Sequence, residues 1–142
     1  MDYTPLFSDE CHLYCSSGHP LFNESDPVQL LAGVNRAKVV HAGVQTSPQV
    51  GEQLSGMNKA AVSYFYEARL AMILSGRYIG FMPDTYVEAY VQAGRLKALL
   101  PEQKQYSLGV AAVTRSHTKS NRPRDLFVEI LRQLHGGASQ AP

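Results

Sequence analysis

The segment Tyr66–Pro83, YEARLAMILSGRYIGFMP, is the part of this chain that most restricts its fold. Apolar residues dominate Glu67–Ser75 and predict a helix, which Gly76 ends because glycine adopts the left-handed conformation without steric cost. A short strand is expected over Tyr78–Met82. Pro83, which has no backbone N–H, then stops further sheet pairing and begins another helix. This order of helix, glycine, strand and proline is a building block of a parallel sheet.

The same alternation continues along the chain and predicts an α/β fold with a mainly parallel sheet flanked by helices. Ala37–Ala42, AKVVHA, is a continuous apolar run of the kind that is buried on both faces of such a sheet. The other strands are expected near His12–Cys15, Lys59–Phe65, Tyr78–Met82, Leu96–Leu100 and Tyr106–Thr114. The helices are expected to begin at Pro27, Thr46, Glu67, Asp84 and Pro123, the last with an apolar stripe of Leu126, Phe127, Ile130, Leu131 and Leu134.

Composition and charge exclude several classes of protein. Charged residues make up 18% of the chain and hydrophobic residues 44%, as in ordinary folded domains. The net charge of +1 gives no general basic excess for nucleic acid, and the basic stretch Arg115–Arg124 is expected to be a solvated loop. No stretch is long and apolar enough to cross a bilayer, and no signal peptide is visible.

The two cysteines favour a reduced, cytoplasmic setting. Cys11 and Cys15 are four residues apart, so in a strand they share a face but lie too far apart for an easy disulfide. A metal site that combines them with His12 or His19 is the alternative, although structural zinc needs four well-spaced ligands.

Two strand ends carry residues that suit a ligand. In α/β sheets, ligands bind beyond the carboxyl ends of the strands, next to helix N-termini. There Gln45, Thr46 and Ser47 offer hydroxyls and free N–H groups for an anion, and Tyr64 and Tyr66 offer aromatic walls with hydroxyl tips.

Several residues at these strand ends also have a purely structural interpretation. Thr46 and Ser47 suit helix caps, and one set of the alternating aromatic residues at Tyr64–Tyr66 suits the core. His41 suits a hydrogen-bonded histidine of the interior.

Four local patterns occur in the order found in the effector-binding domain of LysR-type transcriptional regulators, which the chain therefore resembles. They are the strand that leads into His19-Pro20-Leu21, the helix, turn and strand of Leu70–Pro83, the Gly94-Arg95-Leu96 step with Leu99, and the strand, loop and helix of Leu108–Leu134. Arg77 and Tyr78 depart from the small residues that are usual in the family's turn.

The resemblance implies a type-2 periplasmic-binding-protein fold, in which two crossover strands join two lobes. Residues 1–17 are then a crossover strand from the first lobe, 18–105 the second lobe, and 106–142 the return strand, closing helix and tail. Most of the first lobe and the DNA-binding winged helix-turn-helix are expected upstream of this chain, and the fragment alone is expected to bind effector poorly. The crossovers, mapped onto His12–Ser17 and Leu108–Thr114, add Ser16, Ser17 and Val113 to the candidate site.

The function implied by the resemblance is that of a cytoplasmic effector sensor which regulates transcription. Its expected partners are a small, anionic effector and further copies of the chain in a dimer or tetramer, with DNA bound only through the upstream domain. Neither a cofactor nor a metal is expected. The alternatives are a lobe of a solute-binding transport protein and a small α/β enzyme, although no nucleophile–base signature is visible.

Overall fold

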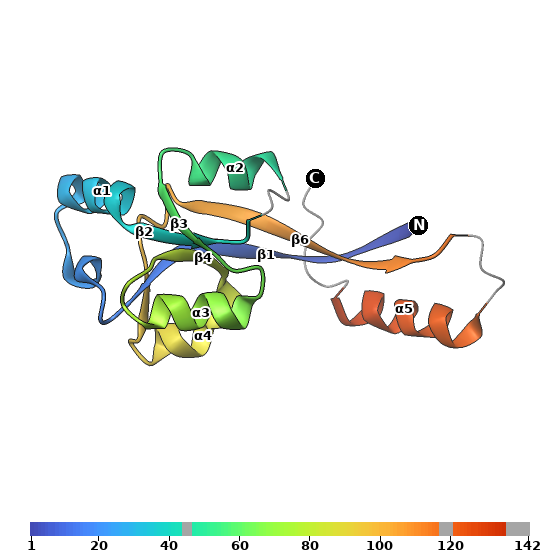
Figure 1. Ribbon diagram of the computed structural model, residues 1–142. Helices are drawn as coiled ribbons and strands as arrows, with labels where there is room; N and C mark the ends of the chain where they lie inside the picture. Colours follow the sequence, from blue (N-terminus) through green and yellow to red (C-terminus); the bar gives the residue numbers. More distant parts are fainter. Residues whose placement is uncertain (44–46, 117–120, 136–142) are drawn as a thin grey trace. The chain divides into compact units, whose positions relative to one another are not determined.

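The computed structural model describes residues 1–43, 47–116 and 121–135, and the chain divides into two compact units. Unit 1 consists of Met1–Asp9 and Ser107–Pro142, and unit 2 of Glu10–Tyr106. The strands are β1 (Asp2–Ser16), β2 (Lys38–His41), β3 (Asn58–Val62), β4 (Gly80–Pro83), β5 (Leu96–Ala98) and β6 (Gln105–Thr114) (Figure 1). The helices are α1 (Pro27–Arg36), α2 (Pro48–Leu54), α3 (Tyr66–Leu74), α4 (Asp84–Gln92) and α5 (Arg122–His135), with a 3-10 turn, η1 (Pro20–Asn23).

The strands of unit 2 lie side by side in the order β3, β2, β4, β1, β5. Strand β2 is parallel to β3, and a parallel bridge joins Val39 to Ile79, the residue that precedes β4. Strand β1 is antiparallel to both β4 and β5. The α/β class is as expected, but the parallel direction applies only to β2, β3 and β4, because β1 enters the sheet from the opposite end.

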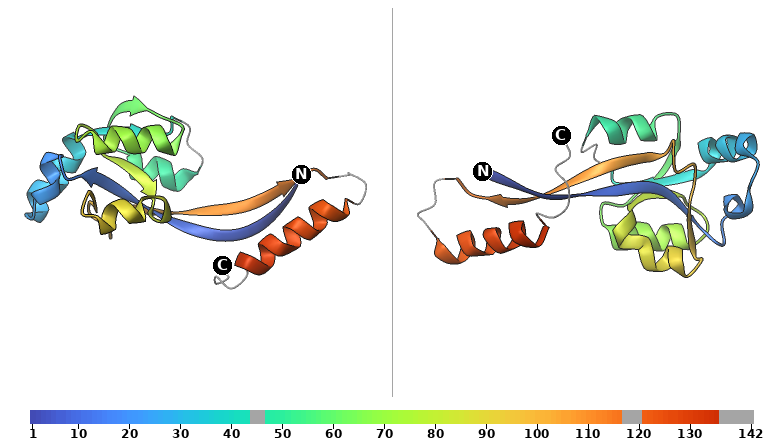
Figure 2. Two further views of the ribbon diagram at one scale, coloured as in Figure 1. Left: turned by 90° about the horizontal axis from the view of Figure 1, so that it is seen from below. Right: turned by 180° about the vertical axis from the view of Figure 1, so that it is seen from behind.

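Helices cover both faces of this sheet (Figure 2). On one face, Val34 of α1 and Val50 and Leu54 of α2 pack in a cluster with Leu13 and Cys15 of β1. On the other face, Leu70 and Ile73 of α3 and Val87 of α4 pack with Tyr14, Val40 and Met82. Alternate residues of β1 therefore contribute to the two opposite cores, as the pleat of a strand requires.

The helix boundaries follow the capping chemistry that the sequence predicts. The side chain of Asp26 accepts a hydrogen bond from the N–H of Val28 at the start of α1, and Ser47 Oγ accepts from the N–H of Val50 at the start of α2. Gly76 has a φ of 77° directly after α3. A Cβ at this position would also lie 2.9 Å from the carbonyl oxygen of Gly18, so glycine is required there.

Two of the expected strands have different bounds in the structure. Strand β1 extends over Asp2–Ser16, well beyond the expected His12–Cys15, and the division between the two units falls within it, between Asp9 and Glu10. Strand β3 ends at Val62, before the expected end at Phe65, because Phe65 is already the N-cap of α3. The prediction that one set of the aromatic residues there is core is wrong for Tyr64 and Phe65, which are 67% and 68% exposed.

Unit 1 contains the helix expected at the end of the chain. The ring of Phe7 lies 4.9 Å from that of His135 at the end of α5, and Ser116 donates a hydrogen bond to Asp2. No described residue of α5 is buried, and its apolar stripe remains exposed at Leu126, Phe127, Ile130 and Leu134. No helix among the described residues is long and apolar enough to cross a membrane.

Replacing Gly80 with alanine should destabilise unit 2. A Cβ there would lie 2.9 Å from the carbonyl oxygen of Val40, whose strand is held on both sides and cannot move away. We expect Gly80→Ala to lower the free energy of unfolding by about 1–3 kcal/mol, measured by urea denaturation. The matched control is Gly109→Ala in β6, where a Cβ meets nothing within 4 Å. Equal stability of the two variants would contradict this account.

Candidate functional site

The carboxyl ends of β2, β3 and β4 lie at one edge of the sheet, and we call this the carboxyl edge. There β2 leads toward α2, β3 into α3, and β4 into α4, so three helix N-termini begin beside it (Figure 1). The first N–H groups of a helix have no partner within it and carry partial positive charge. This edge can therefore bind an anion.

The structure brings some of the predicted site residues to the carboxyl edge. Ser47 caps α2, Tyr64 lies in the loop between β3 and α3, and Tyr66 is the first residue of α3. Tyr64 forms an edge-to-face pair with Phe65, with ring centroids 5.6 Å apart, and both rings are exposed. Gln45 and Thr46 lie outside the described residues.

Ser16 and Ser17, also predicted as site residues, lie away from the carboxyl edge. Because β1 is antiparallel to β4, Cys11 is opposite Pro83 at the carboxyl end of β4, whereas Tyr14 is opposite Gly80 at its amino end. Ser16 continues beyond that amino end and pairs with Leu96, and the N–H of Ser17 bonds to the carbonyl of Arg95. Val113 belongs to unit 1, on β6.

Arg69 is a residue of this edge that the sequence analysis missed. Its side chain begins on the first turn of α3 and is 95% buried, since only 5% of the residue is exposed. Nε and Nη2 donate to the carbonyl of Ser63 at 3.3 and 3.0 Å, Nη2 also donates to Tyr64 O at 3.4 Å, and Nη1 donates to Phe81 O at 3.2 Å. Its guanidinium carbon also lies 5.3 Å from the centroid of the Tyr66 ring. Among the described residues, no carboxylate forms an ion pair with it.

A small cavity at the same edge, which we call the edge cavity, has a volume of about 20 Å³. Its walls combine residues from both helical layers with the ends of β2 and β4. They are Val40, His41, Ala42, Val50, Leu54, Arg69, Phe81 and Tyr106. Helices α2 and α3 cover opposite faces of the sheet. The Arg69 side chain begins on α3 but lines a cavity that α2 also lines, so it reaches past the edge of the sheet.

His41, at the end of β2, is influenced by two positive charges. Burial lowers the pKa of its imidazole, and the charges of Lys59 and Arg69 lower it further. Its Nδ1 accepts a hydrogen bond from the N–H of Gly43. Burial, followed by the neighbouring Cys11, raises the pKa of Tyr106, whereas the positive charge of Arg69 acts to lower it.

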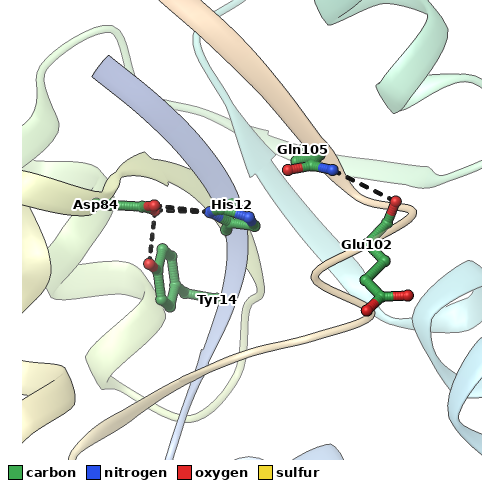
Figure 3. Close-up of polar contacts among 5 residues, drawn as sticks. All are labelled: His12, Tyr14, Asp84, Glu102 and Gln105. Carbon is green, nitrogen blue, oxygen red and sulfur yellow. Dashed lines mark hydrogen bonds and ion pairs between the residues drawn. The ribbon is translucent and has the colours of Figure 1, made fainter.

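A second polar cluster, also missed from the sequence, links β1 to the start of α4 (Figure 3). The Asp84 carboxylate bonds to His12 Nδ1 at 2.8 and 2.9 Å and accepts a hydrogen bond from the Tyr14 hydroxyl at 2.7 Å. Gln105, also drawn, donates from its side chain to the carbonyl of Glu102 in the turn before β6. A groove of about 400 Å³ lies beside this cluster, lined by Tyr14, Asp84, Thr85, Glu88, Val91 and Gln92.

These residues were missed for identifiable reasons. His12 and Asp84 are 72 positions apart, and no local spacing relates them. Arg69 did leave a signal, because it is the only basic residue in the apolar helix YEARLAMIL. Among the described residues, no group of three His, Cys, Asp or Glu side chains is placed to hold a metal ion. Cys11 and Cys15 are both free thiols, and burial raises the pKa of Cys15 to about 11.

Replacing Asp84 with asparagine should loosen the junction between β1 and α4. The substitution removes the negative charge that His12 and Tyr14 contact, although partial exposure of Asp84 limits the effect. We expect Asp84→Asn to lower the free energy of unfolding by about 1–2 kcal/mol. Glu88→Gln, on the same helix and exposed, is the control and should change it by less than about 0.5 kcal/mol. A similar loss in both variants would contradict a specific role for Asp84.

The titration of His41 should report the charge of Lys59. Since its pKa is lowered from 6.5, the contribution of His41 to stability is complete above pH 6.5 and is lost as the pH falls toward the folded-state pKa. We expect Lys59→Gln to raise the NMR titration midpoint of His41, because one repelling charge is removed. Lys38→Gln, at the other end of β2, should not move it. An unchanged midpoint in Lys59→Gln would contradict the assignment of this charge.

Comparison with known proteins gives consistent matches over nearly the whole chain. The family model described as "LysR substrate binding domain" matches residues 1–136. The HTH-type transcriptional activator BauR of Pseudomonas aeruginosa is 31% identical over 129 residues, which cover 91% of this chain but only 42% of BauR. The chain therefore spans less than half the length of this relative.

Solved structures show the same fold at low sequence identity. Full-length HypT of Salmonella typhimurium, a hypochlorite-specific LysR-type transcriptional regulator, matches with a TM-score of 0.69 and 16% identity, covering 96% of this chain and 47% of HypT. The regulatory domain of CrgA from Neisseria meningitidis matches with a TM-score of 0.65 and 19% identity, covering 95% of this chain and 69% of the CrgA chain.

Proposed function

Because the chain belongs to the LysR substrate-binding domain family, we propose that it is the effector-sensing part of a bacterial LysR-type transcriptional regulator. The match over residues 1–136 is the observation on which this proposal rests. The similarity to an HTH-type transcriptional activator favours a regulator over the alternative of a transport-protein lobe. The family is also one of regulators and not of enzymes, so we assign the chain no catalysis.

The two units correspond to parts of different lobes in the proposed sensor. We propose that unit 2 is the second lobe of the sensor and that unit 1 belongs to the first lobe. We place the lobe boundaries at the divisions between the units, between Asp9 and Glu10 and between Tyr106 and Ser107, whereas the sequence predicts them after residues 17 and 105. DNA binding is assigned to a winged helix-turn-helix in the part of the regulator that this chain does not span.

The residues and helix N-termini of the carboxyl edge favour an anionic effector. Three helix N-termini begin there, Lys59 and Arg69 lower the pKa of His41, and Ser47 offers a hydroxyl. Tyr64 and Phe65 present exposed aromatic rings at the same place. An effector that binds one arrangement of the lobes better than another shifts their equilibrium, and a coupling of about 1–3 kcal/mol suffices for regulation. A cytoplasmic location and self-association are further parts of this proposal.

A screen of small metabolites by thermal shift tests the sensor function. Ligands that bind only the folded state raise the unfolding temperature. We expect small carboxylic acids to stabilise the regulator and neutral compounds of the same size to have no effect. The full-length regulator should bind the effector more tightly than this chain alone. Stabilisation by neutral compounds only would contradict the anionic preference, and no hit in any class would count against a sensor.

A further inference from the structure

We propose that Arg69 holds the carboxylate group of the effector, because it is a buried positive charge that forms no ion pair with a carboxylate among the described residues. The inference rests on the proposed function and adds to it the chemical group that is recognised and the residue that recognises it. Three observations support it, concerning the charge of Arg69, its donors and the cavity beside it.

The charge of Arg69 is not neutralised by the described part of the chain. A buried cation is costly unless it is paired, and arginine retains its charge at any physiological pH. Arg69 is 5% exposed, and its described partners are neutral carbonyl groups and an aromatic face. Lys59, which together with Arg69 lowers the pKa of His41, adds a second positive charge nearby. A bound anion would therefore be stabilised strongly at this position.

The donors of Arg69 leave room for one more bond. A guanidinium group has five N–H bonds, and the hydrogen bonds to Ser63, Tyr64 and Phe81 use four of them. Nη1 has two of these N–H bonds and donates one to Phe81 O. Its second N–H has no acceptor among the described residues and is available to a ligand.

The size of the edge cavity favours a carboxylate over a bulkier anion. Its volume of about 20 Å³ suffices for one water-sized group. One oxygen of a carboxylate fits this space while the rest of the effector remains outside. A phosphate or sulfate group can insert one oxygen in the same way, but its three other oxygens form a bulkier group at the mouth of the cavity than the rest of a planar carboxylate does.

Arg69 also has a structural role, which accounts for only part of these observations. Its bonds to Ser63 and Tyr64 hold the loop that carries the exposed pair Tyr64–Phe65, so it links the carboxylate position to the aromatic one. Neutral donors would suffice to hold carbonyl groups. A permanent charge strengthens the hydrogen bonds to a carboxylate ligand.

Titration of the whole chain with sodium acetate, followed by NMR of the arginine side chains, tests the inference. Sodium chloride at equal ionic strength gives the baseline, and sodium phosphate is the bulkier anion. We expect the Arg69 Nε–H and Nη–H resonances to shift saturably with acetate but not with phosphate. Arg95, exposed beside the Tyr90 ring, is the internal control and should show no saturable shift.

Two variants separate binding at Arg69 from general charge effects. Arg69→Gln should weaken acetate binding about tenfold or more, as expected for loss of a charged hydrogen bond, whereas Arg95→Gln should leave it unchanged. Should Arg69→Gln fail to fold, the wild-type resonances decide by themselves. Equal binding of acetate and phosphate, or the absence of a saturable shift at Arg69, would overturn the inference.

The test of Arg69 and the test of the proposed function can succeed or fail independently. An effector from the thermal-shift screen that leaves the Arg69 resonances unmoved would overturn the role of Arg69 while supporting the sensor function. Saturable acetate binding at Arg69, in a regulator that no metabolite stabilises, would support the role of Arg69 and count against the sensor.

Discussion

The central position of β1 in the sheet of unit 2 is the constraint on which the rest of this unit depends. Strand β1 pairs with β4 on one side and β5 on the other, and its side chains enter both cores. Leu13 and Cys15 are fully buried toward α1 and α2, whereas Tyr14 is buried toward α3 and α4. Strand β1 also pairs with β6, and its residues Asp2–Ser16 belong partly to unit 1 and partly to unit 2.

The antiparallel direction of β1 decides which of its residues reach the carboxyl edge. Cys11 and His12 lie beside the end of β4, where His12 meets Asp84 at the start of α4. Ser16 lies at the opposite end and is buried, and its hydroxyl has no hydrogen-bond partner within the described structure. A parallel β1 would have reversed these positions, so strand direction determines the composition of the candidate site.

Burial and charge act together at the carboxyl edge. Arg69 forms hydrogen bonds that hold the β3–α3 loop against β4, and its charge extends into the edge cavity beside His41. The bonds to carbonyl dipoles make burial of the guanidinium tolerable without neutralising it. A domain that responds to an anion by a change of conformation benefits from such an arrangement, because the ligand then completes an electrostatic site that is already ordered.

The sequence by itself determined the local features of this protein. Pro27, Ser47 and Gly76 specify helix ends through capping and backbone conformation, and apolar runs such as Ala37–Ala42 specify strands buried on both faces. These effects act over a few residues, and the family resemblance also depended on such short patterns. Only the tertiary structure decided the direction of β1, the exposure of Tyr64 and the meeting of His12 with Asp84. Strand order and side-chain contacts depend on packing between residues far apart in the chain, and the spacing of neighbouring residues does not reveal that packing.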